Sequence, residues 1–190
     1  MGWSDLVRRR SARVKTTVEG VAAALAEEIV VRTNALQTRL AAEGFAWTNR
    51  ARADTDECLL ECGIFEWFLR DVAVLAGFGQ HAEAVRRALS GRMLVDLQRS
   101  GVSAASLESF DRCSCERFAE YAEALEASSS LQPLGATVWR RVSGSDEPSE
   151  RMTMLLAIRA RAELLRLRDV ARGHRIVELP RSPVPLPDQP

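Results

Sequence analysis

The stretch 56-DECLLECGIFEWFLRDVAVLAGFG-79 is the most hydrophobic and most aromatic run of the chain. Its apolar residues fall on every side of a helix and leave no continuous polar stripe. A helix that is apolar all round is buried, because none of its faces prefers water. We therefore predict an all-α domain, in which about five to six helices form a bundle around this central helix.

The two ends of this central helix carry boundary signals. Asp54 is a plausible N-cap, and Glu57 follows three residues later, where its side chain can reach back to the cap. Gly77 and Gly79 bracket Phe78 and predict the end of the helix. About 24 residues at about 1.5 Å each give about 36 Å, enough to cross a membrane. The charged residues in the middle of the stretch argue against a membrane span.

Those charged residues need partners if they are buried. Glu66 and Arg70 are four residues apart, in the order that favours an ion pair along a helix. Glu61 has apolar residues three and four positions later, so its cation must come from another helix. We expect an interhelical ion pair there, with Arg87 or Arg92 as the candidate partner.

A second interpretation of the same residues is a binding pocket. Glu61, Glu66 and Asp71 would be the polar features of a cavity beside the central helix, and Arg87 and Arg92 would contact an anion. Carboxylates in such pockets often serve as functional groups. Under this alternative the chain is a helical ligand-binding protein or an enzyme, and carboxylates tightly paired with arginine would argue against it.

Length and composition are those of one soluble domain, which we place at residues 1–178. The chain has 190 residues, of which 46% are hydrophobic, and its formal net charge is zero. This neutrality predicts no overall attraction to nucleic acids or membranes. Four cysteines without a signal peptide or membrane span predict a cytoplasmic protein. Lys15 is the one lysine among 26 basic residues, a bias typical of GC-rich bacterial genomes.

The N-terminal region predicts a long helix over residues 4–43, with a bend near Gly20. Its apolar residues recur at spacings of three, four and seven. A compact bundle of this size does not need so long a helix, so part of it is expected to pack on a partner or a second copy. The first turns carry a basic patch made of Arg8, Arg9, Arg10 and Arg13. This patch is either a solvated helix end or a site for an acidic partner or anion.

Apolar spacing and turn residues predict the remaining helices, at about 80–90, 92–100, 104–128, 133–142 and 149–172. The first two are pieces of one helix that is kinked or broken at Ser90-Gly91. Residues 179–190 are rich in proline and predict a flexible tail, which also matches the unspecific P-x-x-P pattern of polyproline ligands.

Metal, cofactor and catalytic motifs are weak or missing in the sequence. Cys58 and Cys62 share a helix face, but Cys113 and Cys115 are two residues apart and would point about 200° away from each other on a helix. Four such thiols do not fit a zinc site. The sequence contains no Glu-x-x-His pair for a di-iron centre and no glycine-rich phosphate loop. We predict no metal, no cofactor and no catalytic residue.

Charge is distributed unevenly along the chain. Residues 51–130 carry 14 acidic and 8 basic residues, whereas residues 151–175 carry 7 arginines against 2 acids. The basic last helix is therefore expected to pack beside the acidic middle, within one subunit or between two. No aromatic residues interleave with its arginines, so we do not expect nucleic-acid binding. We predict a non-enzymatic interaction or assembly module that binds a protein partner or forms a homo-oligomer through its long N-terminal helix.

Overall fold

The computed structural model describes residues 14–44, 52–147 and 149–177. This part of the chain contains six packed α-helices and two short strands, which confirms the all-α prediction. The helices are α2 (Val18–Ala42), α3 (Arg52–Gly77), α4 (Ala82–Arg99), α5 (Ala104–Glu126), α6 (Gln132–Ser143) and α7 (Glu150–Gly173). A single 3-10 turn, η2 (Gly79–His81), joins α3 to α4. The proline-rich tail predicted at 179–190 lies outside the described residues.

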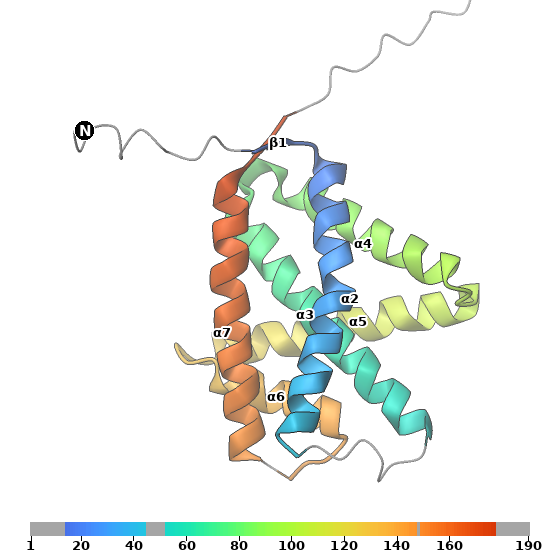
Figure 1. The fold of residues 1–190 in the computed structure, drawn as a ribbon, viewed down its shortest axis with the longest axis vertical. Coiled ribbons are helices and arrows are strands. Elements are labelled where there is room, and N and C mark those ends of the chain that lie inside the picture. The colour runs from blue at the N-terminus through green and yellow to red at the C-terminus, as the bar shows by residue number, and fades with distance from the viewer. Residues whose placement is uncertain (1–13, 45–51, 148, 178–190) are drawn as a thin grey trace, which may run out of the picture.

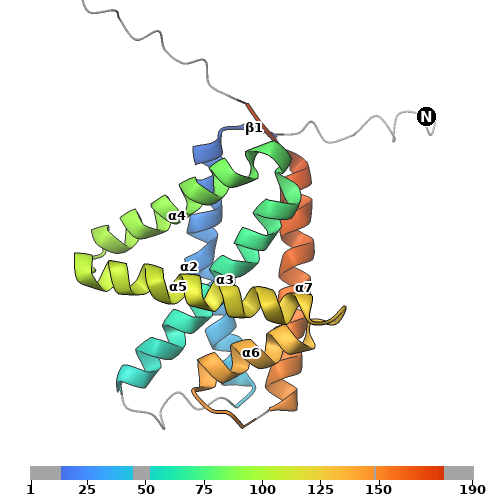
Figure 2. The ribbon, with the colours of Figure 1, turned by 180° about the vertical axis from the view of Figure 1, so that it is seen from behind.

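Helix α3 is the centre of the bundle, as the sequence predicts. It contacts each of the other five helices. In Figure 1, α2 and α7 run side by side in front of it, and Figure 2, the view from behind, shows α5 and α6 crossing its opposite side. Ile64, Phe65 and Leu69 have no exposed surface. Among the described helices, none combines the length and the apolar character that crossing a membrane requires.

The boundaries of α3 agree only partly with the prediction. The helix begins at Arg52, so Asp54 lies inside it and the predicted N-cap is wrong. The end at Gly77 is confirmed, and Gly79 follows with a φ of +51°, in the left-handed region that glycine tolerates. A cap-type residue does not fix a helix start when earlier residues can also take helical geometry.

The N-terminal helix is shorter than predicted. It begins at Val18, where the Thr17 side chain caps it by accepting a hydrogen bond from the Gly20 N–H at 3.0 Å. Residues 14–16 form a strand, β1 (Val14–Thr16), that pairs in parallel with β2 (His174–Ile176). The prediction of a helix is therefore wrong for residues 14–17, because β-branched residues favour extended backbone when a partner strand is present. Positions 4–13 lie outside the described residues.

Helix α4 runs without a break through Ser90-Gly91, so the predicted division into two helical pieces is wrong. Val85 and Leu89 are fully buried, and α4 packs on α2 over this stretch. One glycine costs a helix about 1 kcal/mol, which the burial of these two side chains outweighs. The predicted helices at 104–128, 133–142 and 149–172 correspond to α5, α6 and α7, with ends that differ by about two residues at most.

Six aromatic rings fill the space between α3 and α5. We call them the aromatic layer: Phe65, Trp67 and Phe68 of α3 with Phe110, Phe118 and Tyr121 of α5. The Trp67 ring meets Phe118 edge-on, with ring centroids 5.1 Å apart, and stacks on Phe110 at 5.9 Å. Edge-on and offset contacts of this kind stabilise aromatic pairs beyond the area that they bury.

Candidate functional site

The most unusual feature of the interior is a fully buried arginine on α3. The Arg70 guanidinium donates to a Glu66 carboxylate oxygen at 3.0 Å and to the Glu66 carbonyl at 2.7 Å. It also donates to the Glu163 carboxylate of α7 at 3.2 Å. Burial lowers the pKa of Arg70, and the charges of the surrounding carboxylates oppose this shift. The predicted Glu66–Arg70 pair is thus confirmed, and it extends to a second helix.

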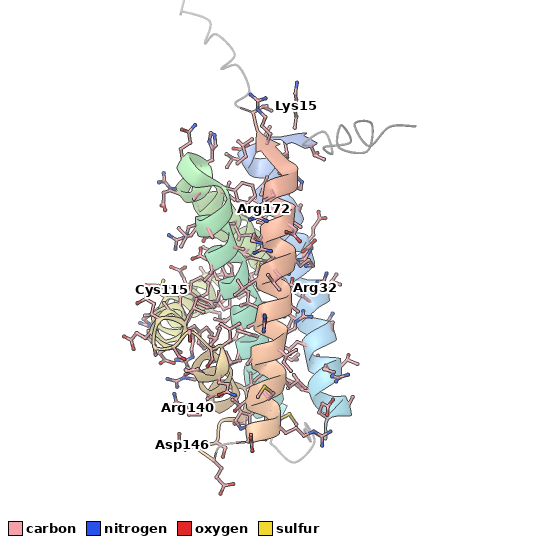
Figure 3. All side chains as sticks on the ribbon, turned by 90° about the vertical axis from the view of Figure 1, so that its left-hand side faces the viewer. Lys15, Arg32, Cys115, Arg140, Asp146 and Arg172 are labelled. Carbon is pink, nitrogen blue, oxygen red and sulfur yellow. The ribbon has the colours of Figure 1, made fainter. Side chains whose placement is uncertain are left out.

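Further arginines join this pair to α2 and α7. Arg159 donates its Nε–H to Glu66 at 2.9 Å, and Arg166 binds both Glu163 and Glu28 of α2. Arg32, on the side of α2 next to α7 (Figure 3), lies 3.7 Å from Glu163. We call these residues the ionic network: Glu28, Arg32, Glu66, Arg70, Arg159, Glu163 and Arg166. It links α2 and α3, which are consecutive in the chain, to α7, which begins more than 70 residues after α3 ends.

Glu163 shows how this network affects protonation. Burial by itself would raise the pKa of the Glu163 carboxyl. Its hydrogen bond with Arg166 and the charges of Arg166, Arg70 and Arg32 outweigh burial and hold the pKa below the ordinary value. The carboxylate is therefore stable in its ionised form, which suits an ion pair between helices better than proton transfer.

Glu61 is paired across the aromatic layer with α5. Its carboxylate accepts from Arg117 Nε at 2.8 Å and from the Tyr121 hydroxyl at 3.3 Å. Burial and the nearby Glu61 charge raise the pKa of Tyr121. The expected interhelical ion pair exists, but the suggested partners Arg87 and Arg92 are wrong.

Arg87 and Arg92 are held within their own helix instead. Arg87 is largely exposed and lies 3.6 Å from Glu83, and Arg92 donates to Asp96 at 2.8 Å. The α4 residue that reaches the central helix is Arg86, which binds Asp71 at 2.6 Å. Asp71, Glu61 and Glu66 are thus each paired with a different arginine. Neither Arg87 nor Arg92 joins these carboxylates, so the predicted site residues do not form one cluster. Arg8, Arg9, Arg10 and Arg13 lie outside the described residues.

The sequence contains a signal for part of the network that our prediction missed. Glu163 falls among the buried positions Met152, Leu156, Ala160 and Leu167 of α7, where an apolar residue is expected. A charged residue at such a position needs a buried partner. The partners themselves come from other helices, so spacing along one helix does not identify them.

Several depressions on the surface are large enough to receive side chains of another molecule, and two of them border the helices of the ionic network. One lies between α2 and α7 and has a volume of about 440 Å³. The other, of about 540 Å³, lies beside the last turns of α3, and Asp71 and Arg86 line it. Both are open grooves rather than enclosed cavities, so they fit contact with a protein surface better than enclosure of a small substrate.

The cysteines are divided between the core and the surface. Cys58 and Cys62 are buried on α3, and Cys58 Sγ lies 2.6 Å from the Val142 carbonyl oxygen. Burial raises the pKa of the Cys62 thiol well above its ordinary value, which makes it a poor nucleophile. Cys113 is half-buried, whereas Cys115 is exposed on the outer side of α5 (Figure 3).

Comparisons with known proteins identify no relative of this chain. The chain matches no protein-family model, no curated protein and no solved structure at a significant level. The function of this chain therefore has to be inferred from its own residues and their contacts.

Proposed function

We propose that this chain is a non-enzymatic helical interaction module that self-associates through α2 and the neighbouring part of α7. The exposed side of α2 carries the proposal. Ten positions between residues 24 and 42 are exposed: Ala24, Glu27, Val30, Val31, Asn34, Ala35, Thr38, Arg39, Ala41 and Ala42. Four of them are alanine and two are valine, and the two charged ones have opposite signs. An exposed helix side with this share of apolar residues favours contact with another chain.

The adjacent part of α7 extends this surface. Met154 and Ile158 are 39% and 61% exposed, and Val31 of α2 is 66% exposed. All three lie at or beside the groove between the two helices, whose lining includes Ala35. We call Val31, Ala35, Met154 and Ile158 the α2–α7 face. Large apolar side chains gathered on two neighbouring helices are typical of a protein contact.

A second copy of the chain is the occupant that suits this face. In a two-fold symmetric dimer the same surface patch faces itself, so a charged patch would repel its own copy. The α2–α7 face itself carries no charge, and the arginines that also line the groove, Arg39, Arg151 and Arg159, are paired with Glu43 or Glu66. Ala24, Val31, Thr38 and Ala42 recur at spacings of seven, seven and four, and small residues at such positions let two helices approach closely.

The interior supports a role without catalysis. Glu61, Glu66 and Asp71 each bind an arginine from another helix. A buried carboxylate that is paired with arginine at hydrogen-bonding distance fits an ion pair between helices. We therefore do not propose the enzyme or small-molecule pocket that these three residues first suggested.

We also propose a cytoplasmic setting. Among the described residues, which include all four cysteines, no disulfide forms, and the two cysteines on α3 are buried. Free thiols persist in a reducing compartment, whereas oxidising compartments tend to convert them to disulfides. Exposed Cys115 is the thiol that tests this expectation, because an oxidising compartment would modify it first.

Light scattering coupled to size-exclusion chromatography tests self-association. We expect the purified chain to have about twice its mass of 21.0 kDa. Val31→Glu places a charge in the middle of the α2–α7 face and is expected to give a monomer, because the two carboxylates would face each other across the symmetry axis. Ile158→Glu should have the same effect if α7 shares the interface.

Val95→Glu is the matched control. Val95 is 41% exposed on α4, away from the α2–α7 face, so this variant should keep the mass of the wild type. A wild-type monomer at every concentration tested would overturn the proposal. So would a Val31→Glu variant that remains a dimer.

A further inference from the structure

One side of the last turns of α3 is not covered by another helix. In Figure 2, α5 and α6 cross in front of α3, and above α5 no described helix crosses α3 between α4 and α7. Leu75 is 51% exposed there, whereas Phe68, seven residues earlier on the same side of the helix, is 3% exposed. The crosswise layer of helices therefore ends before α3 does.

Side chains line this uncovered region as a continuous apolar groove. Two depressions, of about 540 Å³ and 320 Å³, share Val72 and Ala76 of α3. Phe118 and Leu125 of α5 line the first, and Leu164 and Leu165 of α7 line the second. We call this surface the α3 groove. It is distinct from the α2–α7 face, because α3 and α5 form most of it.

The two rims of the α3 groove differ in charge. Arg161 and Arg168 lie on the α7 rim, seven residues apart, so they project from the same side of that helix two turns from each other. Arg161 has no ion pair or hydrogen bond with any residue that the structure describes, and Arg168 has only its neighbour Asp169, at 3.8 Å. On the opposite rim Asp71 and Arg86 neutralise each other, and Glu126 adds a negative charge. The positive charge of the groove therefore lies along α7.

We infer that the α3 groove binds an amphipathic helix of another protein, with its apolar face on Leu75 and Leu165 and acidic residues opposite Arg161 and Arg168. A helix fits because the groove offers apolar side chains and no free backbone groups. An extended peptide would bury its own N–H and C=O groups there without partners, whereas a helix satisfies them internally.

The partner helix is therefore defined by its chemistry. In the partner helix, apolar residues recur at heptad spacing. Glutamate or aspartate residues seven positions apart follow one edge of it, matching the spacing of Arg161 and Arg168. This inference goes beyond self-association, since it uses another surface and another chain. The peptide-binding test can fail while the dimer test succeeds, and the dimer test can fail while the peptide-binding test succeeds.

Fluorescence anisotropy with two synthetic peptides provides the test. The first is a capped, fluorescein-labelled peptide of about 15 residues, long enough to form a helix on binding. It carries leucine at heptad a and d positions, glutamate along one flanking edge, and alanine and glutamine elsewhere. The second has lysine in place of glutamate. We expect the wild-type protein to bind the glutamate peptide at least about tenfold more tightly than the lysine peptide.

Variants of the groove make the test specific. Leu75→Glu should weaken binding of the glutamate peptide about tenfold, because it places a carboxylate against the apolar face of the peptide and close to the peptide's own carboxylates. The double variant Arg161→Glu, Arg168→Glu should reverse the preference and bind the lysine peptide more tightly. Both sites are exposed, so neither change opens the core, and circular dichroism confirms that each variant is folded.

The controls are Val95→Glu on α4 and Arg172→Glu on α7, whose side chain is 68% exposed beyond the groove. Both should bind the glutamate peptide as the wild type does. Equal binding of the two peptides, or no saturable binding of either, would overturn the inference. A Leu75→Glu variant that turns a wild-type dimer into a monomer would also overturn it, since a second copy would then occupy the groove.

Discussion

The two sides of α3 are buried by different chemistry. Toward α2 and α7, Glu66 and Arg70 enter the ionic network, whereas toward α5 the neighbouring residues Phe65 and Phe68 enter the aromatic layer. Burial of an aromatic ring stabilises the fold in many ring orientations. A buried charge is tolerated only when its partners lie at hydrogen-bonding distance. We therefore expect the aromatic layer to supply burial energy and the ionic network to set how α2 and α7 align on α3.

The largest expected effect comes from removing the charge at the centre of the network. Arg70→Met should lower the free energy of unfolding by about 3–5 kcal/mol, because buried Glu66 and Glu163 lose the cation between them. Urea unfolding followed by circular dichroism measures the change. The matched control is Arg161→Met, since Arg161 is exposed, and its effect should stay within about 0.5 kcal/mol. Equal stability of Arg70→Met and wild type would mean that methionine packing fully replaces the network.

The aromatic layer should respond somewhat less strongly to the loss of one ring. Phe118→Ala is expected to cost about 3 kcal/mol, near the lower end of the range for phenylalanine, because its ring is only half-buried. The loss includes its edge contacts with Trp67 and Phe68, at centroid distances of 5.1 and 5.5 Å. Val95→Ala serves as the exposed control in the same urea assay. A loss below about 1 kcal/mol would show that the layer repacks around the gap.

The ionisation of Glu163 makes the stability of the fold depend on pH. Its pKa is lower in the folded protein than its ordinary value of 4.5, so ionised Glu163 stabilises the fold above that value. This contribution is lost as the pH falls from 4.5 through the lower pKa of the folded state. Glu163→Gln should cost about 2 kcal/mol at neutral pH and should remove part of the loss of stability on acidification. Urea midpoints measured from neutral to acidic pH test this, and parallel curves for variant and wild type would contradict it.

The smallest expected effect lies where the two kinds of chemistry meet. Tyr121 belongs to the aromatic layer, and its hydroxyl also donates to Glu61, which Arg117 already neutralises. Tyr121→Phe keeps the ring and should cost about 1 kcal/mol. A double-mutant cycle with Glu61→Gln separates this hydrogen bond from the rest of the burial. Strictly additive single effects would show that the two side chains do not stabilise each other.

Local features of the sequence were predicted well. The central position of α3 follows from its apolar character on all sides, and the Glu66–Arg70 pair follows from a spacing of four on one helix. The start of α5 and the end of α7 were also close, because Ser103 and Gly173 are local signals. Such features depend on residues a few positions apart, which a single sequence displays directly.

Partners from distant parts of the chain were not predicted. Glu61 meets Arg117 and Tyr121, which follow it by 56 and 60 residues, and Glu66 meets Arg159, which follows it by 93. Many arginines were available to each carboxylate, and helix spacing gives no reason to prefer one of them. The strand over residues 14–16 was missed for the same reason, because its pairing partner begins at His174.

The sequence by itself determined the helical class of this protein, the buried place of α3 and the need of its charges for partners, because helix periodicity and the cost of burying a charge are local properties. Only the tertiary structure decided which arginine serves each carboxylate and which apolar residues remain exposed. Those outcomes depend on how six helices cross, and the crossing is set by side chains of all of them together. The α2–α7 face and the α3 groove are products of that arrangement.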